Sequence, residues 1–204
     1  MKTAVFDAME RCTPEEVQRL LLLVPEQQRT AALRYRHVSG QFAQLKSYLM
    51  LHGLLEHMQL VSPSDELLFD IGPHGKPSLK QYPNIHFNIS HCRNAIAVAV
   101  DSNPVGIDVE SYTNPSESLL RYTMSDSEQQ FIQHSLTPER DFTVLWTRKE
   151  ALFKYRGTGI VISQLHTILN QPDDVDIDTS YFDDKRYALT LVTQRTKETP
   201  TSQQ

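Results

Sequence analysis

Hydrophobic residues in the first third of the chain recur at the spacing of α-helices. The segment Thr13-Pro14-Glu15-Glu16 is a capping box, and it predicts a helix that continues to about Val24. A second helix is expected over residues 26–36. A third is expected from Ser39 to about Gln59, where apolar side chains return with roughly helical period. The N-terminal part of the chain is therefore predicted to be mainly helical.

The pattern then changes to that of β-strands. Residues 67–70 are a short strand candidate, and the glycine- and proline-rich residues 72–77 are expected to form a loop. Ile85 to Ser90 alternates between apolar and polar side chains, which predicts a half-buried strand.

Two further strands are predicted on either side of a polar turn. Ala95 to Val100 is a run of small apolar residues, which is typical of a buried strand. Asp101 to Pro104 has the composition of a turn, and Val105 to Val109 is apolar again. Because the connection is so short, these two strands are predicted to pair as a β-hairpin.

The second half of the chain repeats the order of helices followed by strands. Ser125 to Glu128 is a capping box, and a longer helix is predicted from Thr137 through Lys154, ended by Gly157-Thr158-Gly159. Weaker strand candidates follow at residues 161–162, 166–169 and 187–192. The polar tail from Lys197 is expected to be unstructured.

A repeated helix-then-strand order predicts two subdomains in this chain. At 204 residues the chain is long enough for one large domain or two small ones. We predict an N-terminal subdomain of residues 1–102, a C-terminal subdomain of residues 103–196 and a flexible tail of residues 197–204. The predicted fold class is α/β (α+β).

Composition narrows the functional classes. The formal net charge of −5 argues against general nucleic-acid binding, which usually needs a basic face. Asp7 and Glu10 interrupt the N-terminal segment, so no signal peptide is expected, and the apolar run 20–24 is too short to span a bilayer. The cytoplasm is therefore the expected location, and the two cysteines, Cys12 and Cys92, fit its reducing environment. They form no CxxC pattern, so structural zinc is not expected.

Asp108 and Glu110 stand two apart in a predicted strand. Alternate strand residues face the same side, so the two carboxylates, roughly 6.5–7 Å apart along the chain, can converge on one cation. Oxygen ligands suit Mg²⁺, which fills its other positions with water and substrate phosphates. The neighbouring Gly106 leaves room for a close approach. The other interpretation is an exposed strand face with two solubilising acids.

Glu150 and Lys154 stand four apart in a predicted helix and share one face. One interpretation is a surface ion pair worth about a few tenths of a kcal/mol. The other makes Glu150 a third metal ligand or a general base, and Lys154 a phosphate clamp. The apolar flanks, which include Trp146 and Phe153, favour the second, because a buried charge requires a partner or a function.

Two further segments are weak signals when each is taken alone. Ser90-His91 ends a predicted strand, and Gly75-Lys76-Pro77 is a rigid loop with one cation. The adjacent serine and histidine do not indicate a hydrolase triad, because no nucleophile-elbow motif accompanies them. The other histidines show no metal-ligand spacing.

In combination and in this order, these segments resemble the 4′-phosphopantetheinyl transferases. The resemblance is to the longer, monomeric, surfactin-synthetase-activating class. It is carried by four segments: Gly75-Lys76-Pro77, Phe87 to His91, Gly106 to Glu110, and Trp146 to Lys154. They span residues 75–154, so the N-terminal helices and the C-terminal strands carry little of it.

The resemblance implies a fold and an activity. The fold would be two pseudo-symmetric subdomains, each a small antiparallel sheet packed with helices, with the site between them. The activity would be transfer of the 4′-phosphopantetheine of coenzyme A to a serine of an apo acyl or peptidyl carrier protein. Adenosine 3′,5′-bisphosphate would be released, with Mg²⁺ as cofactor and Mn²⁺ as a tolerated substitute. A cytoplasmic monomer without nucleic-acid or membrane partners would be expected.

The resemblance also implies roles for particular residues. The implied metal ligands are Asp108, Glu110 and Glu150. The implied catalytic residues are Asp108, Glu150 and Lys154, with Glu150 taking the serine proton directly or through a metal-bound water. The implied coenzyme A contacts are Lys76, Pro77, Ser90, His91, Asp108, Lys149 and Lys154, with Lys76 near the adenine end.

One departure from the family and two alternatives accompany this prediction. Where the family usually has basic residues for the coenzyme A 3′-phosphate, residues 25–46 contain glutamines; the basic candidates are Arg29, Arg34, Arg36 and Lys46. Residues 112–136 are a candidate carrier-protein dock. The alternatives are a different Mg²⁺-dependent phosphotransferase or pyrophosphate hydrolase, and a non-catalytic binder of carrier protein or coenzyme A.

Overall fold

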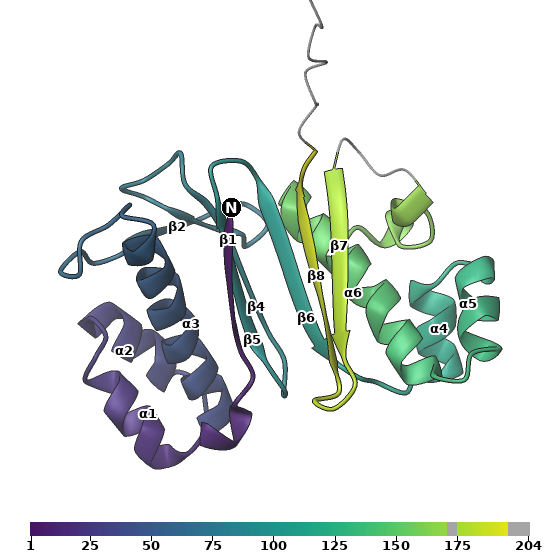
Figure 1. The fold of residues 1–204 in the computed structure, drawn as a ribbon, viewed down its shortest axis with the longest axis horizontal. Helices are drawn as coiled ribbons and strands as arrows, with labels where there is room; N and C mark the ends of the chain where they lie inside the picture. The colour runs from purple at the N-terminus through teal and green to yellow at the C-terminus, as the bar shows by residue number, and fades with distance from the viewer. Residues whose placement is uncertain (171–174, 196–204) are drawn as a thin grey trace, which may run out of the picture.

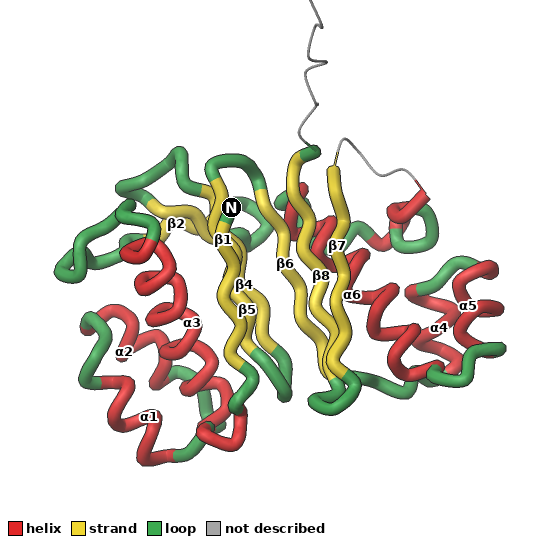
Figure 2. Tube along the Cα trace, in the orientation of Figure 1, coloured by secondary structure: helices red, strands yellow, loops and turns green. Residues whose placement is uncertain are grey.

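The strands form two three-stranded antiparallel sheets and a short two-stranded one. The computed structural model describes residues 1–170 and 175–195 (Figures 1 and 2). The first sheet has the order β1 (Lys2–Phe6), β5 (Ile96–Asp101), β4 (His86–His91). The second has the order β6 (Val105–Ser111), β8 (Tyr187–Gln194), β7 (Val175–Phe182). The short sheet pairs β2 (Phe69–Ile71) with β3 (Pro77–Leu79).

The helices fall into two groups, one for each large sheet. The N-terminal group is α1 (Pro14–Leu21), α2 (Glu26–Leu33) and α3 (Val38–His57). The C-terminal group is α4 (Glu117–Thr123), α5 (Asp126–Gln133) and α6 (Pro138–Arg156). Figure 1 shows the two groups on opposite flanks, with the two sheets between them. Three short 3₁₀ helices are η1 (Met9–Arg11), η2 (Ile162–Gln164) and η3 (Ile168–Asn170).

The two large sheets have the same topology. In each, the first strand of the repeat is followed by helices and then by two antiparallel strands, and the last strand lies in the middle of the sheet. The predicted α/β class with small antiparallel sheets packed with helices is confirmed. The change from one repeat to the next falls at residues 102–104, between β5 and β6. The division into subdomains at residue 102 stays a prediction, and the predicted tail of residues 197–204 lies outside the described residues.

Most elements predicted from the hydrophobic pattern are present. The three N-terminal helices, the strands at 86–91, 96–101, 105–111 and 187–194, and the long helix that contains Trp146 to Lys154 all form. The Ser125 capping box is present with both of its reciprocal hydrogen bonds. Gly157 ends α6 in the left-handed conformation, at φ 68°.

Several predictions about strands were wrong. The strands on either side of residues 102–104 do not pair as a hairpin, because β5 pairs with β1 and β4 whereas β6 pairs with β8. Residues 161–162 and 166–169 contribute to η2 and η3 rather than to strands. The sequence pattern also missed β1, β3, β7 and α4. Short apolar runs do not distinguish a strand from a helical turn, since only the partner element decides between them.

The central strand β5 is buried on both faces, and its two faces carry side chains of different size. Ile96, Val98 and Val100 belong to the core under the N-terminal helices. The alternate residues Ala97 and Ala99 pack against β6 and β8. Small side chains on this second face let the two sheets approach each other closely. No helix in the described part of the chain is long and apolar enough to cross a membrane.

Helix α6 lies directly on the backbone of β6 at Gly106. A Cβ atom built at Gly106 would lie 2.1 Å from the carbonyl oxygen of Ala151 and 2.5 Å from the amide nitrogen of Tyr155. The room beside Gly106, expected from the sequence to serve a ligand, is therefore filled by helix backbone. This contact sets α6 against the strand that carries Asp108 and Glu110.

We predict that Gly106→Ala destabilises the fold by about 3 kcal/mol or more, because helix backbone cannot move aside as a flexible side chain can. Gly53→Ala is the matched control: Gly53 is exposed in α3, and nothing lies within 4 Å of its Cβ position. It should stabilise by about 0.5–1 kcal/mol through helix propensity. Urea unfolding measures both changes, and similar values for the two variants would contradict the proposed contact.

Candidate functional site

Three side chains from three different elements meet where the two repeats join. Asp108 of β6 is almost fully buried, at 1% exposure. Its Oδ1 accepts a hydrogen bond from the hydroxyl of Ser90 of β4 at 2.8 Å. The same oxygen forms an ion pair with the ammonium of Lys154 of α6 at 2.5 Å. Lys154 Nζ also donates to the hydroxyl of Ser90 at 3.0 Å. These three predicted site residues are therefore brought together.

Local periodicity explains how these side chains converge. Strand alternation gives Gly106, Asp108 and Glu110 the same face of β6, and the absence of a side chain at Gly106 lets α6 cover that face. On α6, Glu150 and Lys154 are one turn apart, and their charged groups are 3.8 Å apart. On β4, Ser90 and Asn88 lie opposite Ala97 and Ala99 in the register, so they face the second sheet.

The carboxylates of the site repel one another. Burial, together with the charges of Asp108 and Glu150, raises the pKa of Glu110 to about 7. Burial and the charge of Asp108 also raise the pKa of Glu150 above its ordinary value. Lys154 opposes both shifts but supplies only one positive charge. An additional cation would therefore be stabilised here.

The chemistry of these residues fits a divalent cation. Asp108 Oδ2 is buried and has no hydrogen-bond partner in the described part of the chain. An unpaired carboxylate oxygen next to two further carboxylates suits an oxygen-preferring ion such as Mg²⁺. Among residues 1–170 and 175–195, however, no three His, Cys, Asp or Glu side chains already form a metal-binding group. Lys154 occupies the other oxygen of Asp108 instead.

A cleft of about 270 Å³ opens beside this group. Its walls come from both repeats: Lys76, Pro77 and Asn88 from the first, and Glu150, Phe153 and Lys154 from the second, among others. Two predicted coenzyme A contacts, Lys76 and Pro77, thus share one cleft with Glu150 and Lys154. His91, at the exposed end of β4, lines two neighbouring hollows instead.

Lys76 also closes the end of α6. Its Nζ donates to the backbone oxygens of Lys154 at 2.6 Å and Val105 at 3.0 Å, with Tyr155 O at 3.3 Å. The last carbonyls of a helix lack partners within the helix, and a cation is favourable there. Burial lowers the pKa of Lys76 to about 8. Lys76 therefore joins the first repeat to the second at the edge of the cleft.

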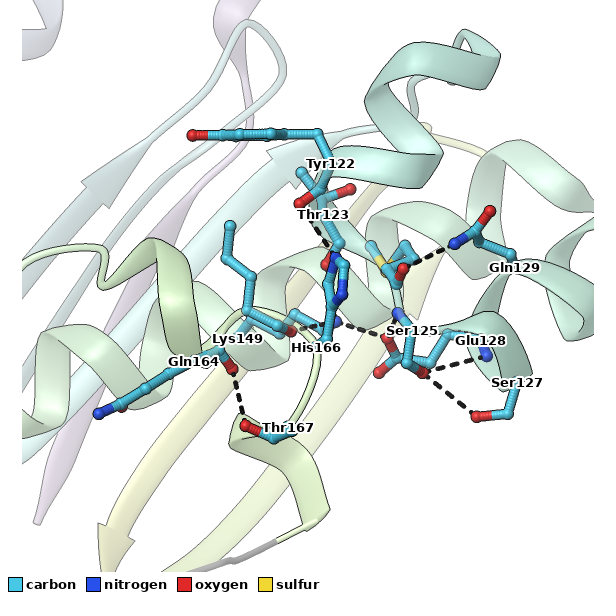
Figure 3. A network of polar contacts seen from close by, with 12 residues as sticks. Tyr122, Thr123, Ser125, Ser127, Glu128, Gln129, Lys149, Gln164, His166 and Thr167 are labelled. Atoms are coloured by element: carbon cyan, nitrogen blue, oxygen red, sulfur yellow. Dashed lines mark hydrogen bonds and ion pairs between the residues drawn. The ribbon is translucent and has the colours of Figure 1, made fainter.

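Lys149 does not join the site with Glu150 and Lys154. Its side chain is fully buried, and its Nζ donates to Thr123 O at 2.8 Å, to Leu165 O at 2.7 Å and to the Glu128 carboxylate at 2.5 Å (Figure 3). The predicted phosphate contact of Lys149 is not supported by this position. The reason is helical geometry, because successive residues on a helix point about 100° apart.

The sequence pattern missed two residues that shape the site. Asn88 accepts the backbone N–H of Ile107 at 2.8 Å, which joins β4 to β6 beside Asp108. The signal was available, because Asn88 has the same strand parity as Ser90. Gly106 was noticed, but its contact with α6 was not foreseen, since no local pattern indicates which distant element will cover a glycine.

Comparisons with known proteins identify a family that part of this chain resembles. Residues 104–202 match the family model of the 4′-phosphopantetheinyl transferase superfamily. Residues 104–202 are therefore similar to that superfamily. The resemblance predicted from the four sequence segments is thereby confirmed.

Curated relatives extend the similarity to the superfamily over most of the chain. The chain is 30% identical over 148 residues to the 4′-phosphopantetheinyl transferase psf-1 of Bacillus pumilus, covering 72% of this chain and 63% of the relative. It is 27% identical over 151 residues to the 4′-phosphopantetheinyl transferase Sfp of Bacillus subtilis strain 168, covering 72% and 66%. The 4′-phosphopantetheinyl transferase AcpT of Salmonella typhi is 33% identical over 110 residues, covering 48% and 52%. The chain thus spans less than two thirds of the length of these relatives.

We predict that Lys149→Met destabilises the C-terminal repeat by about 3–5 kcal/mol, because it leaves the Glu128 carboxylate and two buried carbonyls without their cation. Arg121→Met is the matched control: its ion pair with Glu117 is exposed, so its loss should cost less than about 1 kcal/mol. Denaturant unfolding separates the two values. An equally small cost for both would show that Lys149 is not a structural cation.

The raised pKa of Glu110 should make the stability of the fold depend on pH. The folded chain holds the proton of Glu110 more tightly than the unfolded chain, since the folded pKa is raised from 4.5 to about 7. In buffer that contains a metal chelator, the free energy of unfolding should therefore fall as the pH rises from about 4.5 through about 7. Glu150 shifts in the same direction. Glu110→Gln should weaken this dependence, whereas Glu117→Gln, an exposed helix residue, should leave it unchanged.

Mg²⁺ should raise the unfolding temperature more at pH 8 than at pH 5, because protons and the metal compete for the same carboxylates. Asp108→Asn should remove most of this stabilisation. Thermal unfolding with and without Mg²⁺ at each pH measures the effect. If Mg²⁺ stabilises the wild type and Asp108→Asn equally, the metal assignment is wrong.

Proposed function

We propose that this chain is a Mg²⁺-dependent 4′-phosphopantetheinyl transferase that uses coenzyme A. The observation that carries the proposal is the group formed by Ser90, Asp108 and Lys154 across the two repeats, with Glu150 at the same cleft. The superfamily match supports the reaction type, and the names of the curated relatives agree with it.

The proposed reaction transfers the phosphopantetheine of coenzyme A to a serine of an apo acyl or peptidyl carrier protein. The serine oxygen forms a bond to the β-phosphorus of coenzyme A, and the bond from that phosphorus to adenosine 3′,5′-bisphosphate breaks. The nucleophile comes from the partner, which is consistent with the absence of a nucleophile motif in the sequence. Reactions of this kind depend mainly on positioning and on stabilisation of negative charge.

Glu150 is suited to accept the serine proton. Burial and the charge of Asp108 raise its pKa above the ordinary value of a glutamate, which makes its carboxylate a stronger base. It lines the cleft that would hold the substrate. A serine hydroxyl is a weak nucleophile at neutral pH, so removal of its proton is needed for attack.

Lys154 is suited to bind the pyrophosphate. Its ammonium lies in the same cleft and pairs with Asp108 and Glu150. If a bound cation neutralised the carboxylates, the Lys154 ammonium would be free to contact a pyrophosphate oxygen. Ser90 holds the Asp108 carboxylate by a hydrogen bond and thereby orients it.

Asp108, Glu110 and Glu150 would hold Mg²⁺. When bound, the metal would neutralise charge on the pyrophosphate oxygens. The carrier would dock near residues 112–136, where Tyr122 and Phe131 expose 54% and 57% of their surface. We expect a monomer, because one chain already contains both repeats. As the sequence suggests, we expect it in the cytoplasm.

The decisive experiment is the intact mass of an apo carrier protein after incubation with this chain, coenzyme A and Mg²⁺. A gain of one phosphopantetheine is expected. No gain with several carriers that a known transferase modifies would overturn the proposal. Release of a nucleotide from coenzyme A without any carrier would instead favour a pyrophosphate hydrolase.

We predict that Asp108→Ala and Glu150→Ala lower turnover by several orders of magnitude, because each removes a charge that the transition state needs. Asp178→Asn is the matched control, since Asp178 is an exposed carboxylate on β7 of the same sheet. Initial rates of carrier modification measure the effect. An unchanged rate in Asp108→Ala would show that the site is wrongly assigned.

A further inference from the structure

A larger hollow in the first repeat adjoins the proposed site. It has a volume of about 550 Å³, within the usual range of about 300–1,000 Å³ for small-molecule pockets. It lies between α2, α3 and β4 and shares Gly75, Pro77 and Ile89 with the cleft that contains Glu150 and Lys154. A ligand with its pyrophosphate at Lys154 could therefore extend into this hollow without leaving the protein surface.

The walls of this hollow carry no formal charge. None of the described residues that line it is Asp, Glu, Lys or Arg. Its polar groups come mainly from Gln27, Gln28, Gln44 and Ser47. His91 also lines it, and partial desolvation together with the charge of Lys154 lowers the pKa of this imidazole, which disfavours its charged form.

Two basic side chains of the N-terminal helices, Arg29 and Lys46, are engaged in other contacts. Arg29 donates to Val24 O at 3.0 Å and pairs with Glu26. Lys46 lies over the ring of Phe6, at 4.4 Å from its centroid. Neither residue lines the hollow. They are two of the four basic candidates that the sequence had left for a phosphate contact, and the other two, Arg34 and Arg36, do not line the hollow either.

The neutral polar groups are arranged to bind a hydrogen-bonding ring system. The side-chain amide of Gln44 donates to that of Gln28 at 3.2 Å, so the two amides form one polar patch. Gln28 is 95% buried and Ser47 is 94% buried, and Ser47 Oγ has no hydrogen-bond partner in the described part of the chain. Amide side chains pair well with adenine, and aromatic rings such as that of Tyr48 offer apolar contact.

A phosphate monoester would be poorly accommodated in the same place. Removing a doubly charged group from water requires a cation or several charge-assisted hydrogen bonds, and neutral amides provide neither. The hollow therefore fits the adenine and ribose of the donor better than a phosphate on that ribose.

We propose that this chain recognises the nucleoside of its donor and not the 3′-phosphate, so that 3′-dephospho-coenzyme A is an equivalent phosphopantetheine donor. The proposal rests on the proposed function. In the reaction with this donor, the serine oxygen forms the bond to the β-phosphorus and adenosine 5′-monophosphate leaves in place of adenosine 3′,5′-bisphosphate. Every other atom of the reaction is unchanged.

The test compares coenzyme A with 3′-dephospho-coenzyme A in two measurements. Calorimetry with Mg²⁺ gives the dissociation constant of each donor, and intact mass gives kcat/KM for transfer to the same apo carrier. For the wild type we expect both ratios to lie within about threefold of one, because no charged contact distinguishes the donors.

Gln28→Lys should create the missing contact and raise the preference for coenzyme A by about tenfold or more, since a charge-assisted hydrogen bond is worth at least that factor. Gln44→Lys is a second variant, used if Gln28→Lys does not fold. Thr30→Lys is the matched control: it adds the same charge to an exposed position of α2 that does not line the hollow. Thr30→Lys should leave the ratio near one.

The outcomes separate this inference from the proposed function. Equal binding of both donors, with the preference appearing only in the hollow-lining lysine variants, supports the inference whether or not transfer occurs. A wild-type preference for coenzyme A of tenfold or more in binding overturns it. Binding of neither donor overturns both this inference and the proposed use of coenzyme A. Equal binding without transfer to any carrier overturns only the proposed transferase activity.

Discussion

The contact between α6 and the bare backbone of Gly106 is the constraint on which the site depends. A side chain at this position would collide with helix backbone at Ala151 and Tyr155, so α6 can lie against β6 only because the residue is glycine. That close contact brings Lys154 within ion-pair distance of Asp108. The site therefore depends on the absence of a side chain at Gly106 as much as on its charged residues.

The fold concentrates negative charge where it is costly. Asp108, Glu110 and Glu150 face one another with a single ammonium among them, and burial raises the pKa of the two glutamates. A protein selected for stability alone would not retain this arrangement, because unbalanced buried charge is destabilising. This electrostatic cost is expected in a site that binds a metal ion and a pyrophosphate, as we propose.

Three lysines near this junction have different roles that geometry assigns. Lys154 faces the carboxylates, Lys76 closes the carbonyl end of α6, and Lys149 neutralises Glu128 inside the C-terminal repeat. Figure 3 shows how the Lys149 network joins α4, α5 and the segment at Gln164 to Thr167. Lys149 thus supports the helix that carries the site, although it does not reach the substrate cleft.

The sequence by itself determined the long helices, the strands around β4, β5 and β6, and the ordered segments that carry the superfamily resemblance, because these depend on local periodicity and residue chemistry. Only the tertiary structure decided that β5 and β6 belong to different sheets, that residues 162–164 form a helical turn and that β1 completes the first sheet. It also separated Lys149 from Lys154 and left the hollow beside Gln28 without charge. The physical reason is that strand pairing and side-chain placement depend on partners far away in the chain, which no local pattern specifies.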